Sequence, residues 1–218
     1  TELELLHILV RLVRRATRWF LRNHRLNLSC ELLIADYSKP TEILLAELPA
    51  LQKDQWIALW NGERDELTDL GVELELAERL AATDSMFMSM GVVQTALISK
   101  MPVQKVAEIY FGLGEFLSLD WFMAQIVDLH PDSRWQDLAR ETYVDDLESQ
   151  RRRLTACLCK LSVTDSSAME TWQDRQQELI HRWKLMMKDL REVPQSDFAM
   201  ISVALRELLN LVQASLDS

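Results

Sequence analysis

Two cysteines one residue apart, Cys157 and Cys159, are the residues whose types and spacing come nearest to a metal site. Zinc sites usually space their thiolates by two or more residues and add a second pair of ligands, which this sequence does not supply. On a helix, residues two apart point in different directions, so the two thiols would not converge on one ion. The sequence therefore predicts structural thiols and no metal site.

Acid–base and nucleophilic chemistry has equally few candidates. The acidic pair Asp145–Asp146, followed by Arg151, is typical of a solvated or salt-bridged helix face, and paired catalytic carboxylates would need a cleft. The histidines lie in separate segments, and the sequence sets no acid–base partner beside any of them; they are His7, His24, His130 and His181. We therefore predict no catalytic residue in this chain.

The stretch from 110 to 140 contains two of the five glycines and two of the seven tryptophans. Glycine inside a helix costs about 1 kcal/mol relative to alanine, and a neighbouring helix that passes very close would explain that cost. A nucleotide-binding loop is the alternative, but no strand precedes the two glycines and no third glycine follows at the required spacing. We predict no cofactor site here and a helical packing hub made of Tyr110, Gly112, Gly114, Trp121 and Trp135.

A stripe of arginines follows the helical period of the first expected helix, from about residue 2 to 23. The segment 1–25 carries a net charge of +4, whereas the whole chain carries −10, so the remaining residues carry −14. A solvated face is the ordinary interpretation, and a docking face for acidic residues of this chain or of a partner is the sharper one. The candidate interface residues are Arg11, Arg14, Arg15, Arg18 and Arg22.

The elements that must position these residues are helices. Apolar residues make up 48% of the chain, glycine and proline are few, and no alternating strand pattern occurs. We predict an all-α multi-helix array that ends in an antiparallel bundle of three long helices, at about 134–161, 168–192 and 198–214. Ser133 and Gln136 predict a capping box at the start of the first, and Ser196 or Asp197 a cap on the last.

Shorter helices precede that bundle in the predicted order. They cover about 51–60, with a stop or bend at Asn61–Gly62, then 72–82, 86–100, and a helix that opens at Pro102. A further short helix, capped by Ser118 or Asp120, runs to Leu129. We predict one helical domain over 1–218, with a sub-division into 1–131 and 132–218 as the alternative.

Charge and composition also bear on the protein's surroundings. A net charge of −10 argues against binding to nucleic acid or to an anionic membrane, and no apolar run approaches the roughly 20 residues that cross a bilayer. Three cysteines without a framework spacing fit a reducing compartment, and no signal peptide is visible. We expect a cytoplasmic protein, and the missing initiator Met suggests a piece of a longer chain.

Several short motifs, taken together and in order, resemble the C-terminal end of the large bacterial NAD-specific glutamate dehydrogenases. The resemblance spans about residues 11–155 and continues more weakly to the end. The motifs are WFLRN at 19–23, YFGLG at 110–114, LDW at 119–121, RW at 134–135 with LAR at 138–140, and DDL at 145–147 with QR at 150–151 and LT at 154–155.

That resemblance implies an accessory domain of an oxidoreductase that converts L-glutamate, NAD and water to 2-oxoglutarate, ammonia and NADH. The family's catalytic residues and dinucleotide loop lie in another domain, so NAD would bind the full-length enzyme and not this chain. The implied partners are the catalytic domain of the same polypeptide and other subunits of a homo-oligomer. A self-standing helical adaptor that binds a peptide helix is the alternative, and a small metal or redox protein that uses the Cys157 region is a third.

Overall fold

The computed structural model describes residues 53–162 and 168–217, together with positions 6, 40, 43, 44, 46, 47, 50 and 51. Over these residues the chain forms helices joined by turns, and no strand occurs among them. The predicted all-α class is confirmed. The chain divides into two compact units, Thr1–Gln94 and Thr95–Ser218. Whether the whole protein behaves as one domain, or divides at 131/132, stays a prediction.

The first unit contains α3 (Asp54–Asp69) and most of α4 (Leu74–Ser99). The predicted stop at Asn61–Gly62 is wrong, because α3 continues through it. A Cβ built at Gly62 would meet nothing within 4 Å, so this glycine serves no close contact, and the strong helix formers around it carry the helix onward.

The turn after α3 contains Gly71. Gly71 adopts a left-handed φ of +88°, which glycine reaches without steric penalty. Its N–H donates to Thr68 O at 2.9 Å, and the N–H of Val72 donates to Leu67 O at 3.1 Å. This pair of bonds is a Schellman motif, which satisfies the last carbonyls of α3.

The predicted separation between helices 72–82 and 86–100 is also wrong, since α4 runs without interruption across both. Asp84 and Ser85, of residue types that often cap helices, lie between the two predicted ranges. Neither residue forbids helical backbone, and no glycine or proline lies between them and Leu74, so the helix continues at a small cost in propensity. It ends at Ser99, and Lys100, the next residue, takes a left-handed φ of 54°.

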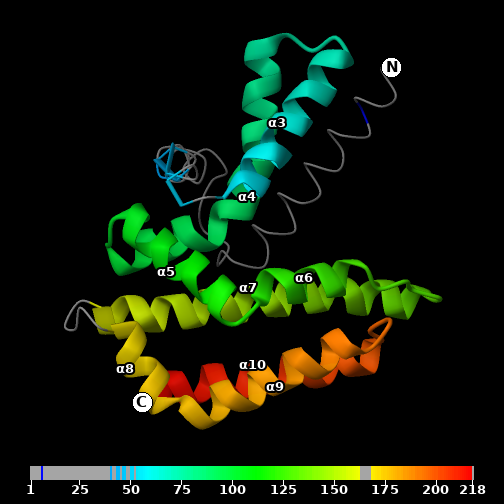
Figure 1. Ribbon diagram of the computed structural model, residues 1–218. Helices are drawn as coiled ribbons and strands as arrows, with labels where there is room; N and C mark the ends of the chain where they lie inside the picture. Colours follow the sequence, from blue (N-terminus) through cyan, green and yellow to red (C-terminus); the bar gives the residue numbers. More distant parts are fainter. Residues whose placement is uncertain are drawn as a thin grey trace, which may run out of the picture. The chain divides into compact units, whose positions relative to one another are not determined.

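The second unit is built around the long helix α7, as Figure 1 shows. Helices α5 and α6 pack along one side of α7, and α10 packs along another, while α8 and α9 connect α7 to α10. The six helices are α5 (Val103–Phe116), α6 (Leu119–Val127), α7 (Arg134–Ser162), α8 (Ala168–Arg175), α9 (Gln177–Glu192) and α10 (Phe198–Asp217).

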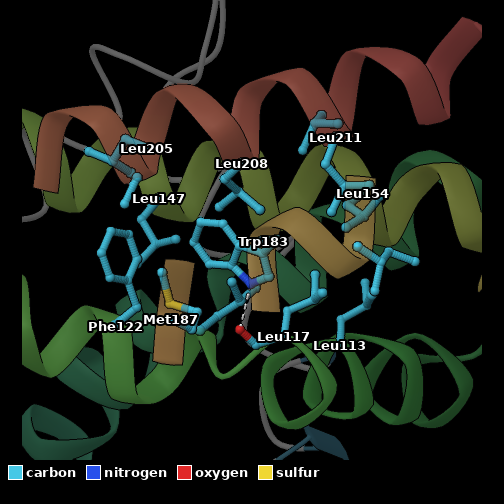
Figure 2. Packing of buried hydrophobic residues seen from close by; sticks show 14 of the residues in the cluster. Leu113, Leu117, Phe122, Leu147, Leu154, Trp183, Met187, Leu205, Leu208 and Leu211 are labelled. Carbon is cyan, nitrogen blue, oxygen red and sulfur yellow. Dashed lines mark hydrogen bonds between the residues drawn. The ribbon is translucent and has the colours of Figure 1, made fainter. Parts of the chain in front are cut away.

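One hydrophobic core joins all six helices of this unit (Figure 2). Trp183 of α9 lies at its centre and is fully buried, with its ring packed edge-on against Phe122 at 5.5 Å between centroids. Leu147 and Leu154 of α7 and Leu208 of α10 contribute the aliphatic side chains around it. Burial of such side chains stabilises the fold by about 1.5–3 kcal/mol each.

The predicted bundle of three long helices is not confirmed, because the helix expected over 168–192 divides at Gln176. Gln176 leaves helical geometry, with φ −106° and ψ 17°, and its side-chain amide donates to Ala214 O of α10 at 3.3 Å. The bend lets α8 pack on α7 and α9 pack on α10. Helices α5 and α6 complete the same core, so in the described part of this unit the core takes in every helix from α5 to α10.

Helix α10 is long and apolar enough to cross a membrane by length and composition alone. Its buried residues recur at helical spacing and line the core against α7 and α9, which is the pattern of a core helix. Asp197 begins it as predicted, since its carboxylate accepts the N–H of Met200 at 2.8 Å.

Candidate functional site

A buried polar cluster lies where α5 and α6 meet α7, and among the described residues that form ion pairs it contains the most heavily buried charge. The guanidinium of Arg151 is 4% exposed, and its Nη1 donates to Asp120 Oδ1 at 2.7 Å. Its Nη2 donates to the backbone oxygen of Tyr110 at 3.2 Å, and its Cζ lies 3.8 Å from the centroid of the Tyr110 ring. The phenol of Tyr110 donates to Glu148 Oε2 at 2.8 Å. The buried cation is therefore paired directly with Asp120, and the ring on which it stacks is bonded to a second carboxylate, Glu148.

Gly114 makes this arrangement possible. The Tyr110 carbonyl is the helical acceptor for the N–H of Gly114, so Arg151 approaches α5 at the place where a side chain on residue 114 would stand. A Cβ built there would collide with Arg151 Nη2 and lie 2.9 Å from Asp120 Oδ2. The absence of a side chain at 114 thus lets the guanidinium reach the backbone of α5.

The electrostatics of the cluster favour a structural role, in which Tyr110 and Arg151 link helices by hydrogen bonds, over a role in acid–base chemistry. Burial raises the pKa of Tyr110, and the Glu148 carboxylate raises it further against the opposing effect of Arg151. Burial by itself lowers the pKa of Arg151, but the neighbouring Tyr110, Asp120 and Glu148 outweigh it and raise that pKa. Both groups stay protonated at neutral pH, so the pair donates hydrogen bonds and transfers no protons.

The turn between α5 and α6 is also bonded to side chains of α9. The indole Nε1 of Trp183 donates to the backbone oxygen of Leu117 at 2.8 Å (Figure 2). Ser118, in the left-handed region with φ 57°, makes no cap bond of its own, and its hydroxyl accepts from Arg191 Nη2 at 2.9 Å. The same guanidinium lies 4.8 Å from the ring centroid of Trp121. A strained turn is therefore fixed by tertiary contacts.

The five residues predicted to form one packing hub do not all lie in the interior. Tyr110 and Gly114 lie in the Arg151 cluster, and Trp121 is half-buried at the edge of the core. Gly112 needs correction, because a Cβ there would meet nothing within 4 Å. Trp135 needs correction too: its side chain is 80% exposed, since the part of α7 that joins the core begins at Tyr143. The role of the hub in the protein stays a prediction.

The two neighbouring cysteines sit on different sides of α7's buried face. Cys157 donates through Sγ to Ser215 O of α10 at 3.1 Å, and burial raises its pKa against the opposing charge of Lys160. Cys159 is fully buried, and burial raises its pKa to about 11. Among the described residues, no group of three or more His, Cys, Asp or Glu side chains is arranged to hold a metal ion.

The arginine stripe at positions 11, 14, 15, 18 and 22 lies outside the described residues. Its proposed docking role stays a prediction from the sequence.

Sequence reasoning missed Arg151 as the centre of a buried cluster, although a signal was present. Arg151 lies four residues after Leu147 and three before Leu154, which places it on the stripe that faces the core. The acidic pair Asp145–Asp146 lies just before it, and such a mixture of opposite charges is typical of a solvated helix face. Asp120 and Trp183 gave no comparable local signal, because their partners lie 31 and 66 residues away along the chain.

Comparison with known proteins adds independent information about this helical array. A family model described as "Glutamate dehydrogenase, C-terminal" matches residues 1–210. The chain is 32% identical over 217 residues to the NAD-specific glutamate dehydrogenase of Pseudomonas aeruginosa, a match that covers 98% of this chain. It is 33% identical over 215 residues to that of Halomonas elongata, and 24% identical over 210 residues to that of Mycobacterium tuberculosis.

These matches cover only a small part of each relative. The chain spans 13% of the length of the Pseudomonas, Halomonas and Mycobacterium proteins, although nearly all of its own residues are aligned. The match therefore concerns one segment of much longer polypeptides, and the resemblance inferred from the motifs is confirmed. The chain belongs to the glutamate dehydrogenase C-terminal family.

Proposed function

We propose that this chain is the C-terminal helical domain of an NAD-specific glutamate dehydrogenase and acts in it as an accessory domain for assembly or regulation. The full enzyme would convert L-glutamate, NAD and water to 2-oxoglutarate, ammonia and NADH, with NAD bound in a domain outside this chain. One observation carries the proposal: 98% of the chain aligns with 13% of a protein that bears that name.

The polar chemistry of the second unit supports an accessory role. The buried cation Arg151 is paired with Asp120 and stacked on Tyr110, and the phenol of Tyr110 is bonded to Glu148. These groups join α5, α6 and α7 to one another, and hydrogen-bonded networks around a buried charge fix a particular packing arrangement. A domain with this interior is suited to hold a shape against the rest of a large enzyme.

The expected surroundings follow from the same proposal. The partners are the catalytic domain of the same polypeptide and other subunits of a homo-oligomer in the cytoplasm. The net charge of −10 supports an assembly that does not use this chain to bind nucleic acid or membrane lipids.

Two preparations test the proposal. The isolated chain, given glutamate and NAD, is expected to form no NADH by absorbance, while the full-length enzyme turns over. Removal of this segment from the full-length enzyme is expected to lower its activity or change its subunit assembly, measured by steady-state kinetics and light scattering. Genuine turnover by the isolated chain, or unchanged kinetics and assembly after removal, would contradict an accessory role.

The arginine stripe gives a narrower prediction within that framework. Arg14→Glu combined with Arg18→Glu reverses two charges of the stripe and is expected to weaken assembly or activity of the full-length enzyme, because opposite charges within a few ångströms attract and like charges repel. Raising the salt concentration should reduce the difference between variant and parent. Identical assembly and kinetics at low salt would remove the stripe as an interface.

A further inference from the structure

We propose that the exposed face at the start of α7, formed by Trp135 and Leu138 and named here the Trp135 patch, is where the preceding part of the same polypeptide docks. This inference rests on the proposed function and assigns it a surface.

The fold of the second unit does not account for these two side chains. Trp135 is 80% exposed and Leu138 is 44% exposed, and they lie three residues apart on one face of α7. Exposed tryptophan gains nothing from the core and is a weaker helix former than alanine. Large aromatic side chains are the ones most enriched at the centres of protein interfaces, so an indole in this position is suited to bind a surface outside the unit.

The patch stands on a rigid support. The N–H of Gln136 donates to Ser133 Oγ at 3.3 Å, and the Gln136 side-chain oxygen accepts the N–H of Asp132 at 2.5 Å. Arg140 donates to Leu129 O at 3.2 Å and to Asp137 Oδ1 at 2.8 Å, which ties α7 back to the end of α6. Because these bonds already order the turn and the start of α7, little backbone freedom would be lost on binding, and such ordering is one of the main costs of association.

The length of the related proteins indicates the occupant. The chain corresponds to 13% of its relatives, and its family is the C-terminal one, so most of such a polypeptide precedes it. The patch offers apolar area on the order of 300 Å², whereas a stable complex of separate chains buries about 800 Å² on each partner. A segment of the same polypeptide binds intramolecularly, so a smaller patch suffices than between separate chains.

The test uses the full-length enzyme with the photo-cross-linking residue p-benzoylphenylalanine at position 135, and in a second variant at position 138. Both variants are expected to give, on irradiation, a cross-link to a peptide that precedes residue 1, in a product that keeps the mass of one subunit on a denaturing gel. The same residue at position 203, where Val203 is 57% exposed on α10, is the matched control and should give no such product.

Three outcomes would overturn the inference. A product with the mass of two subunits would assign the patch to a second copy, a cross-link within residues 1–94 would assign it to the first unit of this chain, and the absence of any product would leave the patch in solvent. Trp135→Ser is expected to shift activity or assembly in the same direction as removal of the whole segment, while Val203→Ser leaves both unchanged.

The two proposals can fail separately. If removal of the segment changes the enzyme but the Trp135 variants neither cross-link nor shift it, the docking surface is wrong and the accessory role stands. If removal of the segment changes nothing, the accessory role is wrong whatever the patch contacts.

Discussion

At the scale of single residues, two glycines of one helix have different roles. Gly114 lies under the Arg151 guanidinium, and the neighbourhood of Gly112 is open. A methyl group at 114 must displace a side chain that is bonded to Asp120 and to the Tyr110 carbonyl. A methyl group at 112 meets nothing and reduces the conformational freedom of the unfolded chain.

Alanine at each position is therefore expected to change the free energy of unfolding in opposite directions. Gly114→Ala should lower it by about 1–3 kcal/mol, as overpacking does. Gly112→Ala should raise it by up to about 1 kcal/mol through helix propensity. Urea denaturation of the two variants and the parent measures both effects, and two changes of the same sign would contradict the assigned contact.

A second residue-scale expectation concerns Cys159. Burial raises its pKa from the ordinary 9.0 to about 11, so the folded state keeps the thiol proton that the unfolded state loses first. The resulting stabilisation is complete below about pH 9 and is lost as the pH rises toward 11. The total loss in the free energy of unfolding is at most about 2–3 kcal/mol.

The measurement is the free energy of unfolding from pH 8 to 11. Cys159→Ala should have a shallower decline than the parent protein, although Cys157 and Tyr110, whose pKa values are also raised, keep part of the slope. Parallel pH profiles for parent and variant would show that the thiol does not titrate differently in the two states.

At the scale of elements, two tryptophan side chains each connect helices that are far apart in sequence. Trp183 of α9 donates to Leu117 O at the corner between α5 and α6, while Trp172 of α8 donates to the Ser215 hydroxyl at 2.9 Å. If the indole N–H of Trp183 were removed, the buried carbonyl of Leu117 would lose this hydrogen bond. The Ser215 hydroxyl would still donate to Leu211 O at 2.7 Å.

Replacement by phenylalanine should separate the two cases. Trp183→Phe is expected to cost about 2–4 kcal/mol, from the lost bond and the smaller ring, and Trp172→Phe should cost less. Thermal unfolding by circular dichroism compares them under one condition. An equal or larger loss for Trp172→Phe would mean that the corner does not depend on its bond to α9.

At the scale of the whole molecule, the hydrophobic core found among the described residues belongs to one of the two compact units. The core cluster runs from Leu113 to Val212 and lies entirely in the second unit. Because that unit contains both the helices and the partners that bury them, residues 95–218 are expected to fold without the first unit. Retained helicity and one cooperative urea transition would agree with this, and a non-cooperative loss of signal would contradict it.

The sequence by itself determined whatever depends on neighbours within a turn or two. Helical periodicity and few breakers predicted the all-α class, Asp197 was one of the two predicted caps of the last helix, and short motifs predicted the family. Ser133 caps Gln136 as expected, although the Gln136 side chain reaches Asp132 rather than Ser133. These features are local, so they are readable from adjacent residues.

Only the tertiary structure decided the features that depend on distant partners. The break at Gln176 has no glycine or proline to predict it and follows from packing α8 on α7 and α9 on α10. The need for glycine at 114, but not at 112, depends on Arg151 reaching α5 from a helix that begins some twenty residues later. Trp135 is exposed and Trp183 buried, although both are tryptophans in helices. Residue type sets what a side chain can bind, but its position in the packed helices sets whether anything is there to bind.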